Sequence, residues 1–227
     1  MESKAYNILM YSHDTYGLGH IRRTMAIARN LVGPEANILI VTGSPIVGRY
    51  TMPRGIDFVR IPGMIKKTNV VYVPHSIKVD PKIAISIRTK IISATAKSFK
   101  PDLLIVDKVP TGLKGEVLPT LKWMRKNLPC SRVVLGLRDI LDDAESTRAD
   151  WKRKKFPQVL RDLYSEIWVY GRKSMYDPIT EYAFPEDIAE KTVFTGYIPR
   201  FIPHTRKTKR KHKQVIVTIG GGGDGYT

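Results

Sequence analysis

The distribution of apolar residues along the chain predicts a series of short, buried strands. Runs of four to six mostly apolar residues recur, a length typical of strands. Most of these runs are continuously apolar rather than alternating, which indicates burial on both faces and therefore a parallel sheet. The expected strands are residues 7–11, 37–42, 57–61, 102–107, 132–137, 166–170 and 192–195.

Apolar residues at helical spacing predict helices between these strands. In the helix expected at 81–99, Ile83, Ile87, Ile91 and Ala94 form an apolar stripe, and lysines form a second one. Such a helix either packs on the sheet or rests on a membrane surface, and we favour packing. Strands that alternate with helices predict an α/β fold with a doubly wound, mostly parallel, Rossmann-like sheet. The expected helices are residues 20–31, 81–99, 115–127 and 146–164.

The pattern breaks after residue 198, and this break predicts a domain boundary. Residues 199–213 contain prolines and the basic run RKTKRKHK, which is typical of a linker. A new apolar strand follows and leads into Gly220–Gly223, close to the last residue. We therefore expect an N-terminal domain at 1–198, a basic linker at 199–213, and at 214–227 the start of a second, truncated domain.

The segment between the first strand and the first helix is the strongest candidate for a binding site. It contains Gly17 and Gly19, followed by His20, Arg22 and Arg23. The glycines are expected to relieve steric limits at the turn, and the helix start directs backbone N–H groups and a positive dipole end at a bound anion. A histidine there can exchange a proton near neutral pH. Adjacent helix positions do not share a face, so we expect one arginine in the site and one in solvent.

Two residues at other strand ends are weaker candidates. Ligands of doubly wound sheets bind at the carboxyl ends of the strands. Asp107 ends one strand, and Arg138 follows another. Helix capping and surface ion pairing explain these two residues equally well.

Common cofactor sites do not fit the sequence. The first glycine loop lacks the third glycine of a dinucleotide site, and the second strand ends in Thr42-Gly43-Ser44 instead of an acid for the ribose. The loop at 220–227 lacks the lysine followed by Ser or Thr that closes a triphosphate loop. Cys130 and the five histidines make no recognised metal-ligand spacing. We therefore expect neither a cofactor nor a metal.

The net charge of +17 predicts an anionic partner. The excess lies in residues 1–100, with 15 Lys and Arg against 5 Asp and Glu, and in residues 200–227, with 7 against 1. A phosphorylated substrate, an acidic membrane surface and nucleic acid all fit this charge. The basic run lacks aromatic residues, so nucleic acid is the least favoured partner. Apolar runs are too short for a membrane span or a secretory signal, which predicts a cytoplasmic protein, with peripheral contact to the inner face of the membrane as an option.

Two glycine motifs together resemble the GT-B nucleotide-sugar glycosyltransferases, particularly glycosyltransferase family 28. The resemblance rests on GLGH with Arg22 and Arg23 after the first strand, and on VTIGGGGDG after the linker. It implies two facing domains, the N-terminal one holding the acceptor and the C-terminal one the nucleotide sugar, such as a UDP-sugar. It also implies catalysis in the cleft without an obligatory metal, and it favours inverting transfer.

The resemblance assigns roles to the candidate residues. His20 is expected to be the base for the acceptor hydroxyl, and its alternative is a helix-start residue bonded to a nearby backbone group. The donor phosphates are expected to bind at Gly220, Gly221, Gly222 and Gly223. The residues expected to bind the acceptor or the diphosphate are Gly17, Gly19, Arg22, Arg23, Asp107 and Arg138. A nucleotide-sugar hydrolase or epimerase on the same scaffold is an alternative, since GLGHIRR also resembles a hydrolase that releases UDP. A non-catalytic basic protein that binds nucleic acid is a third.

Overall fold

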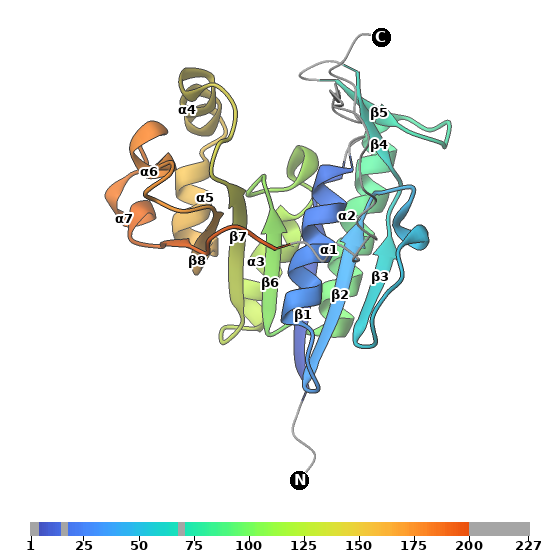
Figure 1. The fold of residues 1–227 in the computed structure, drawn as a ribbon. Helices are drawn as coiled ribbons and strands as arrows, with labels where there is room; N and C mark the ends of the chain where they lie inside the picture. Colours follow the sequence, from blue (N-terminus) through green and yellow to red (C-terminus); the bar gives the residue numbers. More distant parts are fainter. Residues whose placement is uncertain (1–4, 15–17, 68–70, 200–227) are drawn as a thin grey trace, which may run out of the picture.

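A seven-stranded parallel sheet forms the centre of the molecule (Figure 1). The computed structural model describes residues 5–14, 18–67 and 71–199. The strand order is β3-β2-β1-β6-β7-β8-β9, and all neighbouring strands are parallel. These strands confirm the predicted Rossmann-like α/β fold, and their bounds are β1 (Tyr6–Ser12), β2 (Ala36–Thr42), β3 (Ile56–Arg60), β6 (Leu103–Asp107), β7 (Arg132–Arg138), β8 (Glu166–Tyr170) and β9 (Thr192–Phe194).

Both faces of the sheet are buried, as the continuous apolar runs predict. In β1, Ile8 and Met10 pack in the core layer under one helix, α1 (Gly19–Leu31). Leu9 and Tyr11 point to the other layer. That layer is covered by helices α2 (Pro81–Phe99), α3 (Leu118–Asn127) and α5 (Phe156–Leu163). The sheet is therefore doubly wound.

The prediction of one continuous helix over 146–164 is wrong. The structure has two helices there, α4 (Ala144–Arg153) and α5, separated by Lys155 with a left-handed φ of 55°. Proline is tolerated only in the first turn of a helix, and Pro157 lies in the first turn of α5. Three further pieces were not predicted, namely the antiparallel hairpin of β4 (Met64–Lys66) and β5 (Tyr72–Pro74), and the short helices α6 (Pro178–Glu181) and α7 (Glu186–Ala189).

Helix α2 packs on the sheet, but through a different stripe from the predicted one. Its buried residues are Ala84, Arg88, Ile92 and Ala96, whereas Ile83 is 53% exposed. The buried stripe contains a charged residue, which the apolar pattern alone excludes. In the described part of the chain, no helix has the length and apolar character required to cross a membrane.

The order of the strands places a topological switch between β1 and β6. From β1 the chain passes through α1 to β2 on one side, and it later returns through α2 to β6 on the other side (Figure 1). Ligands of doubly wound sheets bind at this point, next to the carboxyl ends of the strands. Of the linker predicted at 199–213, only Pro199 lies within the described residues, and the second domain expected at 214–227 lies outside them.

Candidate functional site

A histidine and a carboxylate are paired at the switch point. His20 is the second residue of α1, and Asp107 is the last residue of β6. His20 Nδ1 lies 2.5 Å from Asp107 Oδ2. Because an ionised carboxylate only accepts, this contact favours the tautomer in which Nδ1 carries the proton and Nε2 is the basic nitrogen. Arg23 Nη2 also lies 3.2 Å from Nδ1. The His20 side chain is 20% exposed, so it is held in place without being sealed off.

Arg23 completes the neutralisation of Asp107. One helical turn after His20, its Nη2 donates to Asp107 Oδ1 at 2.5 Å. Burial alone would raise the pKa of the Asp107 carboxyl, but the hydrogen bond from His20 and the charge of Arg23 outweigh it and lower the pKa to about 2. Asp107 is therefore ionised at neutral pH, which fixes the orientation of the imidazole. The Arg23 guanidinium also lies over the ring of Tyr170, 5.8 Å from its centroid.

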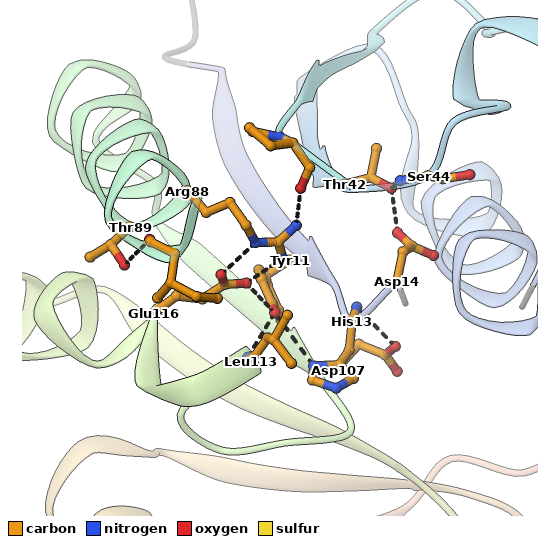
Figure 2. A network of polar contacts seen from close by, with 12 residues as sticks. Tyr11, His13, Asp14, Thr42, Ser44, Arg88, Thr89, Asp107, Leu113 and Glu116 are labelled. Carbon is orange, nitrogen blue, oxygen red and sulfur yellow. Dashed lines mark hydrogen bonds and ion pairs between the residues drawn. The ribbon is translucent and has the colours of Figure 1, made fainter. Parts of the chain in front are cut away.

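A buried polar network supports the site from the other face of the sheet (Figure 2). The fully buried Arg88 on α2 binds Glu116 through two hydrogen bonds of 2.5 and 2.6 Å and donates to the Pro62 carbonyl. Glu116 accepts from Tyr11 Oη at 2.6 Å, and that oxygen lies 3.4 Å from His13 Nδ1. The network therefore ties α2 to the end of β1, next to the candidate site.

His13 is a second histidine close to the first. Its ring centroid lies 5.7 Å from that of His20, and the residue is 7% exposed. Burial, together with the charges of His20 and Lys108, lowers the pKa of His13 to about 3, despite the opposite effect of Asp107. His13 is therefore neutral across the physiological range.

We expect His13 to make the folded state sensitive to acid. The unfolded chain binds a proton near the ordinary pKa of 6.5, whereas folded His13 stays neutral down to about 3. Its contribution to stability is thus complete above pH 6.5 and is lost as the pH falls toward 3. Between pH 7 and 5, the free energy of unfolding should fall by about 2 kcal/mol from this residue.

Urea unfolding at the two pH values measures this loss, and His13→Gln isolates the share of His13. Asp14, with a raised pKa, and Asp107, with a lowered one, act with opposite signs and remain in both proteins. An equal loss of stability in the wild type and in the variant would contradict the prediction.

Asp14 and Thr42 form another buried contact at the carboxyl ends of β1 and β2. The Thr42 hydroxyl donates to Asp14 Oδ2 and accepts from the Ser44 N–H at 3.1 Å (Figure 2). Burial raises the pKa of the Asp14 carboxyl, although the nearby hydroxyls of Thr42 and Ser12 oppose this. Asp14 and Ser44 are 2% and 3% exposed.

Lys108 brings a partly buried cation to the same edge. It follows Asp107 directly and has a left-handed φ of 66°, which is uncommon for a residue with a side chain. Burial lowers the pKa of its amine, and Asp142 partly offsets this. Strained backbone of this kind concentrates at functional sites.

The structure brings together some of the predicted residues and separates others. His20, Arg23 and Asp107 form one cluster, and this arrangement favours a positioning role for Asp107 over direct contact with a diphosphate. Arg22 is exposed and lines a groove on the outer side of α1 with Arg29 and Tyr50. Arg138 is exposed and donates to the Leu141 carbonyl at 3.5 Å. Gly17 and Gly220–Gly223 lie outside the described residues.

Gly19 shows no steric demand for glycine among the described residues. Its φ lies outside the left-handed range, and a Cβ built there would meet no described atom within 4 Å other than those of its chain neighbours and its own helix backbone. The turn itself, residues 15–17, lies outside the described residues. Open space above the first residue of α1 is compatible with the close approach of a ligand.

Several polar residues of the site were not among the candidates, although signals for them exist. His13, Asp14, Ser44 and Lys108 all lie within three residues after the carboxyl ends of predicted strands, where the topology places ligands. Arg88 is a charged residue at helical spacing within the apolar stripe of α2. Its partner Glu116 lies in a loop and carries no comparable signal.

Comparison with known proteins gives a fold but no close relative. No protein-family model matches the chain, and no curated protein shows significant sequence similarity to it. A glycosyltransferase from Rickettsia africae ESF-5 matches with a TM-score of 0.54 and 12% identity, over 84% of this chain and 42% of the other. The glycotransferase of kitacinnamycin matches with a TM-score of 0.52 and 12% identity, over 91% of this chain and 55% of the other.

Both solved structures are much longer than this chain, which spans only about half their length. At 12% identity the likeness shows a shared fold. The described part of the chain is therefore a Rossmann-like α/β domain that shares its fold with the matching parts of these two structures.

Proposed function

We propose that this chain is the acceptor-binding half of a nucleotide-sugar glycosyltransferase and that His20 is its general base. The observation that carries the proposal is the 2.5 Å contact between His20 Nδ1 and Asp107 Oδ2 at the switch point of the sheet. A histidine oriented by a buried carboxylate presents its other nitrogen as a base. The glycosyltransferase-like fold supports the same reaction class.

The proposed reaction is a single displacement at the anomeric carbon of the donor sugar. His20 Nε2 takes the proton of an acceptor hydroxyl as its oxygen forms a bond to that carbon. The bond from the same carbon to the diphosphate breaks, and the diphosphate leaves with the electron pair. Attack from the side opposite the leaving group inverts the configuration. Asp107 stabilises the imidazolium that forms, as a carboxylate does in other histidine bases.

The departing diphosphate needs positive charge. We assign this role to backbone N–H groups and nearby cations rather than to a metal ion. Lys108 is a partly buried cation next to Asp107. The donor is proposed to bind at Gly220–Gly223, outside the described residues.

The full-length natural protein tests this function directly. It is incubated with a panel of UDP-sugars, with and without sugar and alcohol acceptors, and the release of UDP is measured. Transfer predicts release that depends on the acceptor, persists in EDTA, and gives a product of inverted configuration by NMR.

Two other outcomes have clear meanings. Acceptor-independent release of free sugar and UDP would identify a hydrolase, in which water replaces the acceptor at the same base. No release from any donor, by protein that is folded, would contradict the proposal.

We also propose a cytoplasmic protein that contacts an anionic membrane surface peripherally. The net charge of +17 supports contact with an anionic surface.

A further inference from the structure

Two buried oxygen atoms near the candidate base are left without partners. Among the residues that the structure describes, Asp14 Oδ1 and Ser44 Oγ make no hydrogen bond. Both residues are more than nine-tenths buried. Leaving a buried polar group unsatisfied is costly, so an orphaned atom of this kind calls for an explanation.

The two atoms belong to one small cluster. The Thr42 hydroxyl is used on both sides, because it donates to Asp14 Oδ2 and accepts from the Ser44 N–H (Figure 2). Thr42 therefore fixes both residues but leaves the second carboxylate oxygen and the serine hydroxyl to bind something else. The main chain of Asp14 is held as well, since its N–H donates to the Ser12 carbonyl at 2.8 Å.

The cluster lies at the same edge of the sheet as the base. Asp14 follows His13, whose N–H lies 3.4 Å from the Asp107 carboxylate that orients His20. β1 is the strand between β2, which ends at Thr42, and β6, which ends at Asp107. The orphaned atoms thus follow the ends of β1 and β2, and the carboxylate that orients the base ends the neighbouring strand β6.

The chemistry of the two atoms selects their ligand. A carboxylate oxygen repels phosphate, and it accepts strongly from a hydroxyl. The serine hydroxyl both donates and accepts, as does the hydroxyl of a sugar or polyol. A sugar or polyol offers a hydroxyl for each of the two atoms, whereas a simple alcohol offers only one.

We propose that Asp14 and Ser44 form a subsite that binds hydroxyl groups of a sugar or polyol acceptor next to the hydroxyl that His20 deprotonates. This inference rests on the proposed function and names the chemical class of the acceptor. Asp14 and Ser44 are binding residues in it and take no proton from the reacting hydroxyl.

Binding is measured first, without any donor. Saturation-transfer NMR on the full-length protein uses the methyl glycosides of glucose, galactose, mannose and N-acetylglucosamine, and each monodeoxy analogue of those that bind. Asp14→Ala and Ser44→Ala should each weaken binding about tenfold. Asp57→Ala, at an exposed position of β3, is the matched control and should leave binding unchanged.

The deoxy analogues show whether the effect is direct. Removing one particular hydroxyl of the glycoside should weaken binding to the wild type. The same removal should not weaken binding to Asp14→Ala, because the contact is already lost there. This is the pattern that a double-mutant cycle gives for a contacting pair. A second position should couple to Ser44 in the same way. Thermal unfolding of both variants identifies any loss caused by misfolding.

Kinetics separate this role from catalysis. With a donor and a glycoside acceptor, the variants should raise KM for the acceptor at least fivefold with little change in kcat.

Three results would overturn the subsite. The wild-type protein could bind no glycoside of the panel, or the folded variants could bind the glycosides as tightly as the wild type does. The deoxy analogues could also show no coupling to Asp14 or Ser44. Because the NMR measurement needs no turnover, it decides on the subsite even if the protein transfers no sugar.

Discussion

Replacing His20 with alanine is expected to lower kcat for glycosyl transfer roughly 10²- to 10⁴-fold, the range that a general base contributes. The fold should survive, because Asp107 keeps its ion pair with Arg23 when the imidazole is removed. Asp107→Asn should also lower kcat, since an amide cannot stabilise the imidazolium or satisfy Arg23 as a carboxylate does. Initial rates at saturating donor and acceptor measure both effects.

Two controls make the result interpretable. Lys126→Ala changes an exposed side chain of α3 and should leave kcat unaltered. Donor binding to His20→Ala, measured by calorimetry with UDP, should match that of the wild type. A folded His20→Ala protein with wild-type kcat would remove His20 from the mechanism.

The second large effect concerns stability. Arg88→Met is expected to lower the free energy of unfolding by about 3–5 kcal/mol, because it leaves the Glu116 charge buried without its partner. For a domain of this size, that loss corresponds to a drop of roughly 10 °C in the unfolding temperature. Thermal and urea unfolding followed by circular dichroism measure the two quantities.

A double-mutant cycle separates the ion pair from the packing of the side chains. Arg88→Met/Glu116→Met should cost less than the sum of its single variants, because no charge stays buried alone. The exposed pair of Arg153 and Asp150 is the matched control, and Arg153→Ala should cost under about 1 kcal/mol. An Arg88→Met protein as stable as Arg153→Ala would show that the buried pair contributes little.

The sheet could be predicted from the sequence because its strands are buried on both faces. A continuous apolar run identifies such a strand even when its neighbouring strands are unknown. The rule that ligands of parallel sheets bind at the carboxyl ends of the strands predicts that His20 and Asp107 lie at one edge of the sheet. That they touch could not be predicted, since it depends on how α1 sits against β6 across 87 residues of sequence.

The misses have physical reasons. The predicted buried stripe of α2 is wrong because the true stripe contains Arg88. Arg88 can be buried because it pairs with Glu116, a partner outside the helix that a local pattern cannot reveal. Pro157 is the sequence signal for the break between α4 and α5, because proline is tolerated only in the first turn of a helix. The orphaned oxygens of Asp14 and Ser44 depend on packing, and no sequence pattern indicates them.

Gly19 has a practical consequence for engineering. Among the described residues, a Cβ at this position would meet no atom within 4 Å apart from its chain neighbours and its own helix backbone. Substituting Gly19 with side chains of increasing size therefore tests how close a bound substrate lies to the first residue of α1. Any change in turnover along such a series reports on the bound molecule, with the scaffold held constant.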